Sequence, residues 1–140
     1  MKKLIALFCG LGLLMGAVSC NPSTEDEEIY TMDLTATAWS SGSGSLAINF
    51  LINNGISIVN HGHVFIQGTY SWDGKTVKAS FTKRIDNYNG QMDEWQESDL
   101  TGNPMNLEFG FKLRKGMESA VVAGGGIPGH DDDVILLKVR

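Results

Sequence analysis

The stretch GTYSWDGKTVKASFT, residues 68–82, decides the fold class, because it holds two alternating segments on either side of a turn dipeptide. Apolar side chains stand at every second position on both sides of that turn: Tyr70, Trp72, Val77, Ala79 and Phe81. Asp73-Gly74, between the two segments, tolerates the positive φ of a tight hairpin turn. The stretch therefore predicts two neighbouring antiparallel strands, each with one buried face.

The same period of two recurs along the chain. It is clearest in five segments, residues 30–38, 46–52, 64–72, 77–81 and 105–113. Shorter candidate strands are Ile56–Asn60, Met117–Ala123 and Val134–Val139. A half-buried strand produces this alternation and a helix does not, so the sequence predicts about eight strands.

Turn residues indicate how these strands connect. Asn54-Gly55 and His61-Gly62 lie between neighbouring strands, as Asp73-Gly74 does, and hairpins make neighbours antiparallel. After the first nineteen residues no segment has the 3.6-residue period of a crossover helix, so a parallel sheet is excluded. We predict an all-β, antiparallel up-and-down meander that closes into a barrel, with a β-sandwich as the alternative.

Three features together resemble a known family: the hairpin of residues 68–82, Trp39 near the first strand, and a last strand at the C-terminus. With them the chain resembles the lipocalin-like domains of small Bacteroidota lipoproteins, over most of residues 29–140. The resemblance implies one barrel domain that binds a small apolar molecule or a glycan. The inward positions mix small and large side chains, which permits a modest pocket or a filled core. We expect the filled core, because inward aromatic side chains usually pack against one another.

The first nineteen residues have the layout of a lipoprotein signal peptide. Lys2 and Lys3 precede an uncharged segment, Leu4–Val18, which is shorter than the ~20 residues of a membrane-spanning helix. The segment AVSC, residues 17–20, resembles the lipobox of bacterial lipoproteins, which implies that residues 1–19 are removed and Cys20 carries a lipid. Cys9 leaves with the signal, so the mature chain has no internal disulfide. An ordinary secreted protein with an unmodified Cys20 is the alternative.

Residues 20–28 are the predicted tether between the lipid and the domain. Glu25, Asp26, Glu27 and Glu28 are consecutive acids in a segment without an apolar face, which is typical of solvated chain. The run also resembles the acidic export signal of surface-displayed Bacteroidota lipoproteins. That resemblance implies a lipid-anchored protein of the outer membrane that faces the cell exterior, with the periplasmic face as the alternative.

Length and charge limit the partners. Residues 29–140 suffice for one domain with one core. The chain has 11 basic and 16 acidic residues, a net charge of −5. Without a basic patch to displace counterions from phosphates, nucleic acid is not an expected partner. The expected partners are the membrane, through the lipid, and a small apolar ligand, a glycan or an envelope protein.

Candidate chemistry is sparse. Two groups carry metal-ligating side chains: His61 with His63, and His130 with residues 131–133, which are aspartates able to ligate calcium. Neither spacing matches a known ligand set, so we predict a hairpin turn and a solvated loop, with no metal or other cofactor. The sequence has no serine elbow, cysteine–histidine pair or metalloprotease helix. We therefore predict no catalytic residues and no enzymatic activity.

A polar segment, residues 83–104, separates two predicted strands and carries Tyr88, Met92 and Trp95. Loops of this length are often binding elements, and exposed aromatic side chains stack on sugars or anchor protein partners. We predict that these three residues contact a ligand or partner at the lip of the barrel. The alternative is that Met92 and Trp95 begin another strand or fold back over one end of the barrel.

Two classes of function remain. The first is a non-enzymatic envelope module that binds a small apolar molecule or a glycan. The second is a protein-interaction or inhibitor module that contacts another envelope or extracellular protein. A deep apolar cavity would favour the first class, and a filled interior beside an exposed aromatic patch would favour the second.

Overall fold

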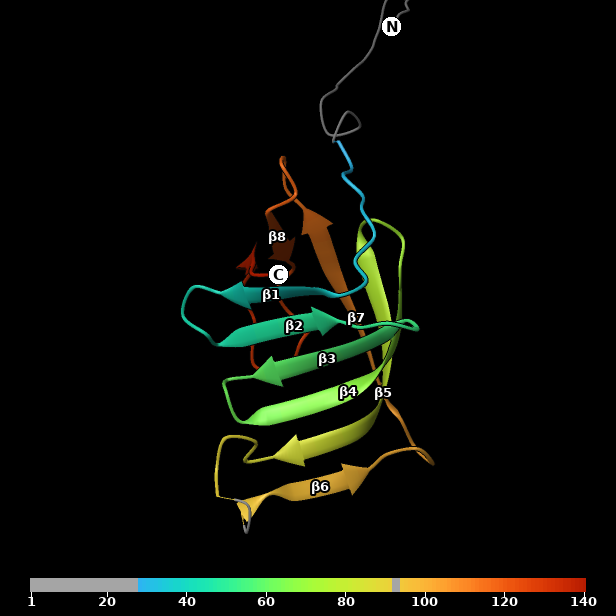
Figure 1. The fold of residues 1–140 in the computed structure, drawn as a ribbon, viewed down its shortest axis with the longest axis vertical. Coiled ribbons are helices and arrows are strands. Elements are labelled where there is room, and N and C mark those ends of the chain that lie inside the picture. The colour runs from blue at the N-terminus through green and yellow to red at the C-terminus, as the bar shows by residue number, and fades with distance from the viewer. Residues whose placement is uncertain (1–27, 92–93) are drawn as a thin grey trace, which may run out of the picture.

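The computed structural model describes residues 28–91 and 94–140, which form nine antiparallel strands (Figure 1). The strands are β1 (Thr37–Ser41), β2 (Leu46–Phe50), β3 (Gly55–Asn60), β4 (Val64–Trp72), β5 (Thr76–Asp86), β6 (Gln96–Asp99), β7 (Met105–Leu113), β8 (Ser119–Val122) and β9 (Val134–Lys138). No α-helix occurs in the two described ranges. Accordingly, none of their residues belongs to a helix long and apolar enough to cross a membrane.

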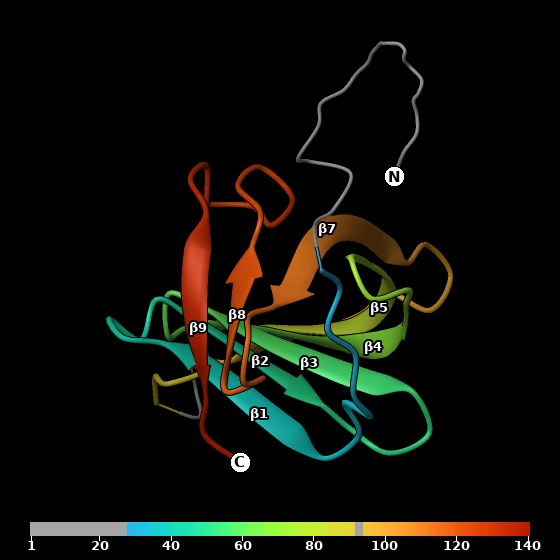
Figure 2. The same ribbon diagram turned by 90° about the horizontal axis from the view of Figure 1, so that it is seen from above.

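Eight of the strands close into a barrel. Strands β1, β2, β3, β4, β5, β7, β8 and β9 pair in that order around the barrel, and pairing of β1 with β9 completes the circle (Figure 2). Trp39 lies opposite Ile48 of β2 on one side and opposite Lys138 of β9 on the other. The predicted up-and-down antiparallel barrel is confirmed. The alternative β-sandwich is wrong, because all strands belong to one closed sheet rather than to two stacked ones.

The ninth strand, β6, is an addition to the long strand β5. Residues Thr76–Phe81 of β5 pair with β7, whereas residues Lys83–Asp86 pair with β6, which lies beside the lower part of β5 in Figure 1. Residues 83–104 are therefore not one long loop: β5 extends to Asp86, and β6 begins at Gln96, next to Trp95, in agreement with the alternative of another strand. The sequence of β6, QESD, has no alternation of apolar and polar side chains, so the period of two does not mark it.

The first strand begins later than the alternation of residues 30–38 predicts. A turn at Thr35 and Ala36, with Ala36 at φ 63°, interrupts the chain, and β1 starts at Thr37. The segment before the turn still alternates because Tyr30 and Met32 pack against the core. Its alternation thus reports burial on one side without the ladder hydrogen bonds of a strand.

The predicted hairpin turns are present. Residues in the left-handed region stand at each of the three: Asn54 at φ 60°, His61 at 52° and Gly74 at 97°. Asp73 orders the last of these turns, since its Oδ1 accepts hydrogen bonds from the backbone N–H groups of Lys75 at 2.9 Å and Thr76 at 2.8 Å. These bonds lower the pKa of Asp73, because they favour its charged form.

Aromatic side chains fill much of the barrel interior. The largest fully buried ones are Trp39, Phe50, Phe81, Phe109 and Phe111. Phe111 lies between Trp39 and Phe50, with ring centroids 5.5 Å and 5.2 Å away in edge-to-face arrangements. The same end of the barrel includes Tyr70, whose ring lies 4.9 Å from Phe50. The expected filled core is present at this end.

Candidate functional site

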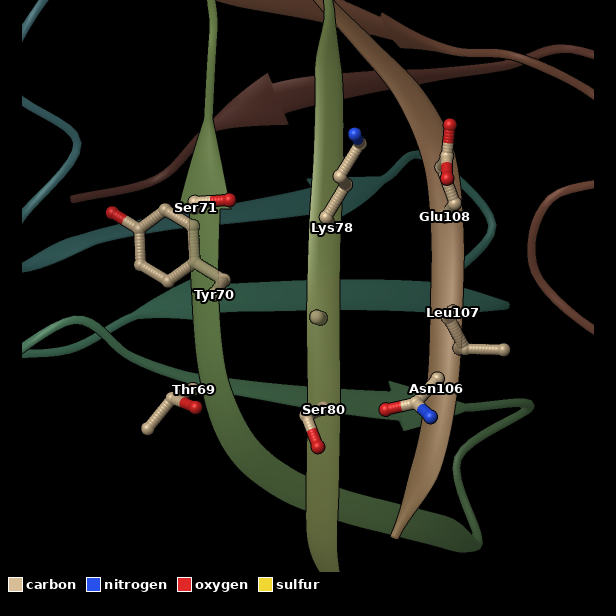
Figure 3. A pocket seen from close by; sticks show the side chains of 9 residues that line it. Thr69, Tyr70, Ser71, Lys78, Ser80, Asn106, Leu107 and Glu108 are labelled. Carbon is tan, nitrogen blue, oxygen red and sulfur yellow. The ribbon is translucent and has the colours of Figure 1, made fainter.

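A hollow lies on the outer wall of the barrel, over β4, β5 and β7 (Figure 3). We call it the outer basin. It has a volume of about 530 Å³, within the range of ligand sites in proteins. Its lining residues are Thr69, Tyr70, Ser71, Lys78, Ala79, Ser80, Asn106, Leu107 and Glu108.

Strand register builds the outer basin from two polar rows. Thr69 of β4 lies opposite Ser80 of β5, which lies opposite Asn106 of β7. The second row is Ser71, Lys78 and Glu108. Because side chains alternate across a strand, these polar residues point outward while their neighbours point toward the core.

Close contact between β4 and β5 shapes the floor beside the outer basin. The register of the two strands shifts between Gln67 and Gly68. A Cβ atom added at Gly68 would lie 1.9 Å from the carbonyl oxygen of Ser80, so only glycine allows this approach. The shift is a bulge in the ladder, and a bulge bends the strands around it.

The chemistry of the outer basin is that of hydrogen bonding. Its rows carry three hydroxyl groups, one amide, one ammonium group and one carboxylate. Hydroxyl and amide groups both donate and accept hydrogen bonds, and so do the hydroxyl groups of sugars. Figure 3 shows Tyr70 and Leu107 turned away from each other on opposite sides of the outer basin. The arrangement suits a polar ligand that lies across the three strands.

The predicted contact residues do not line the outer basin. Tyr88 stacks on Phe65 of β4, with ring centroids 5.0 Å apart, and Trp95 stacks on Tyr88 at 5.7 Å. The indole N–H of Trp95 donates to the carbonyl of Gly90 at 3.2 Å. The two aromatic side chains therefore pack against the barrel wall and against each other. Met92 lies outside the described residues.

The two groups of candidate metal-ligating side chains meet in space through one histidine from each. The rings of His61 and His130 stack with centroids 4.8 Å apart and an interplanar angle of 5°. His130 Nε2 lies 2.6 Å from Oδ1 of Asn60. Within residues 28–91 and 94–140, no group of three or more histidine, cysteine, aspartate or glutamate side chains is placed to hold a metal ion.

Most residues of the predicted lipid anchor and acidic tether lie outside the described residues. Cys20, Glu25, Asp26 and Glu27 lie outside it, and Glu28 is its first residue. Glu28 is exposed and accepts a hydrogen bond from the Tyr30 hydroxyl at 2.6 Å. This hydrogen bond raises the pKa of Tyr30, because it favours the protonated phenol.

Sequence reasoning missed the outer basin. Its residues come from three strands, and which of them are neighbours depends on strand register. A signal was present in the outward positions of the alternating segments, where hydroxyl and amide side chains recur. In comparisons with known proteins, the chain matches no family model, no curated protein and no solved structure.

Proposed function

We propose that the protein is a non-enzymatic, lipid-anchored envelope module that binds a glycan in the outer basin. The observation that carries the proposal is that six polar side chains in two rows line a hollow on the outside of the barrel, while aromatic side chains fill the interior. A pocket for an apolar guest is normally enclosed and lined by apolar side chains. The outer basin instead offers donors and acceptors in two rows, which suits a ligand rich in hydroxyl groups.

The binding role is tested with the double variant Ser71→Ala/Asn106→Ala, which removes one polar group from each row. We expect roughly tenfold or greater loss of affinity for a glycan selected on an oligosaccharide array, since each net hydrogen bond contributes about 0.5–1.5 kcal/mol. The matched control is Gln67→Ala, on β4 but outside the outer basin, which should bind like the parent. Equal binding by the double variant and the parent would contradict the proposal.

A second candidate function, protein interaction, is favoured by one feature of β9. Ile135 and Leu137 of β9 are 49 % and 53 % exposed, and Val139, just after the strand, is 64 % exposed. Contiguous exposed apolar side chains often mark interaction surfaces. The variant Leu137→Ser distinguishes the two functions, because it should weaken binding of a protein partner and leave glycan binding unchanged.

The anchor proposal rests on the sequence before the domain. Cys20 would carry the lipid, and the acidic residues 25–28 would direct the protein to the cell surface. We expect Cys20→Ala to abolish incorporation of a labelled fatty acid and to leave the protein unprocessed or released from the membrane fraction. Labelling of Cys20→Ala at the level of the parent would refute the anchor.

A further inference from the structure

The loop between β8 and β9 reaches into the barrel beside the β3–β4 turn. We call residues 124–130 of this loop the plug. Its Ile127 is 2 % exposed and belongs to the core cluster, although it lies outside the named strands. The plug therefore contributes a side chain to the interior as well as connecting two strands.

Asn60, the last residue of β3, fastens the plug at two points. Its Nδ2 donates to the carbonyl of Pro128 at 2.7 Å, and its Oδ1 lies 2.6 Å from Nε2 of His130. Because an amide oxygen only accepts, Nε2 of His130 must carry the proton. The neutral ring of His130 is thus the Nε2–H tautomer, and Nδ1 remains free to take up a proton.

The plug is well packed in its closed position, and two glycines give its backbone conformational freedom. His130 is 7 % exposed and its ring stacks on His61. Gly125 and Gly129, near the two ends of the plug, have φ values of 88° and 87°, in the region that favours glycine. Rotation about these two residues allows the plug to leave the barrel without moving a strand.

Below the plug lies an apolar pocket of about 110 Å³. Its lining residues are Ile58, Asn60, Val64, Ile66, Arg84, Met105, Leu107, Ile127 and Pro128. An apolar cavity of ~150 Å³ holds a benzene-sized molecule. Withdrawal of Ile127 would enlarge the pocket by one side chain, which brings it to that size class.

We infer that the plug is a gate over this pocket, held closed by neutral His130 and opened by acidification, and that the pocket takes a single-ring or short-chain apolar ligand. The inference goes beyond the proposed function, which concerns the outer wall and needs no movement of the plug.

The direction of the pH effect follows from the surroundings of His130. Burial lowers the pKa of His130 and the neighbouring His61 lowers it further. Titratable groups on the elements around the plug include His63 on the β3–β4 turn, Arg84 and Asp86 on β5, Glu108 on β7, and Asp131, Asp132 and Asp133 next in the chain; β5 and β7 also carry Lys78, Lys83 and Lys112. Arg84 is already paired with Asp86 at 2.9 Å.

A histidine whose pKa is lowered in the closed form stabilises that form above its ordinary value near 6.5. As the pH falls below that value, the open form takes up a proton that the closed form resists. The closed-to-open ratio then falls by up to tenfold per pH unit until His130 protonates in the closed form too.

Gating is tested by hydrogen exchange on the full mature chain carrying Cys20→Ala, which removes any lipid that would compete for an apolar probe. The reporters are the amides of Gly125 and His130, which donate within the plug at 2.8 Å and 3.1 Å. We expect their protection factors to fall about tenfold or more between pH 7.5 and pH 5.0. Unchanged protection factors would overturn the gate.

Three variants identify the responsible group. His130→Gln keeps a donor for Asn60 but cannot titrate, so protection should no longer depend on pH. Asn60→Ala removes both fastening bonds and should give low protection at both pH values. The matched control is His63→Gln, which replaces an exposed histidine of the β3–β4 turn and should behave like the parent. Persistent pH dependence in His130→Gln would exclude His130 as the group that titrates.

The ligand class is tested with benzene, monitored by methyl NMR signals of Ile58 and Ile66. Benzene should shift them at pH 5.0 in the parent and at both pH values in Asn60→Ala. An open plug in Asn60→Ala with unshifted methyl signals would overturn the ligand site. Since glycan affinity in the outer basin is measured separately, neither failure would be mistaken for failure of the proposed function.

Discussion

Replacing Gly68 with alanine should destabilise the barrel by more than ~3 kcal/mol, a large part of the ~5–15 kcal/mol that stabilises a typical domain. The added Cβ would lie 1.9 Å from the carbonyl oxygen of Ser80 and 2.6 Å from Cα of Phe81. Both are backbone atoms, so no side-chain rotation relieves the overlap. The variant must separate β4 from β5 at the point where their register shifts.

Urea unfolding followed by circular dichroism measures this loss. The matched control is Gly102→Ala, in the turn between β6 and β7, where an added Cβ meets nothing within 4 Å. We expect a change within ~0.5 kcal/mol for the control. Similar unfolding midpoints for the two variants would show that β4 and β5 do not approach as closely as the structure has them.

The second large effect is expected for Trp39→Ala, which should cost ~3–5 kcal/mol. The side chain is fully buried, its ring meets Phe111 edge to face, and its indole N–H donates to Oγ1 of Thr37 at 2.9 Å. That hydroxyl in turn donates to the carbonyl of Leu34 at 2.6 Å. Truncation thus leaves a cavity and removes the donor to a buried hydroxyl group.

Trp95→Ala is the informative comparison, because Trp95 is only half-buried and stacks on Tyr88. Loss of one aromatic pair on the outer wall should cost about 1 kcal/mol. Chemical unfolding of both variants gives the two values. An equal loss of unfolding free energy in the two variants would show that the stack of Trp95 on Tyr88 belongs to the core. A smaller loss in Trp39→Ala than in Trp95→Ala would contradict the interior packing of the structure.

The sequence predicted the barrel well, because a strand with one buried and one solvent-exposed face alternates apolar and polar residues with a period of two. β4 and β7 were found within their observed bounds, 64–72 and 105–113. The same rule failed where a segment alternates without pairing, or pairs without alternating. Residues 30–34 alternate without belonging to a strand, and β6 pairs without alternating.

The candidate sites were less predictable, because they depend on contacts between distant parts of the chain. Asn60 and His130 are 70 residues apart, and nothing in either segment indicates that their side chains meet. The outer basin requires the register of β4, β5 and β7 together. Aromatic residues in a polar segment drew attention to Tyr88 and Trp95, but the stack of Tyr88 on Phe65 of β4 depends on strand pairing and could not be read from that segment.

The two hollows divide the barrel into regions with different chemistry. The outer basin is wide and carries two rows of polar side chains, in which Lys78 and Glu108 supply charges of both signs. The pocket under the plug is small and apolar, and the plug covers it. A polar ligand and an apolar one would therefore occupy separate sites, and mutations of residues that line only one site should leave the other unchanged. Leu107 is the exception, since it lines both.

The most direct test of the central claim, that the protein binds its ligand on the outside of a filled barrel, is amide chemical-shift mapping with the glycan selected on the array. We predict shifts confined to residues 69–71, 78–80 and 106–108, with no change at the inward-facing Ile48 and Phe50. Shifts centred on those interior residues, or the absence of any glycan that binds, would contradict the account.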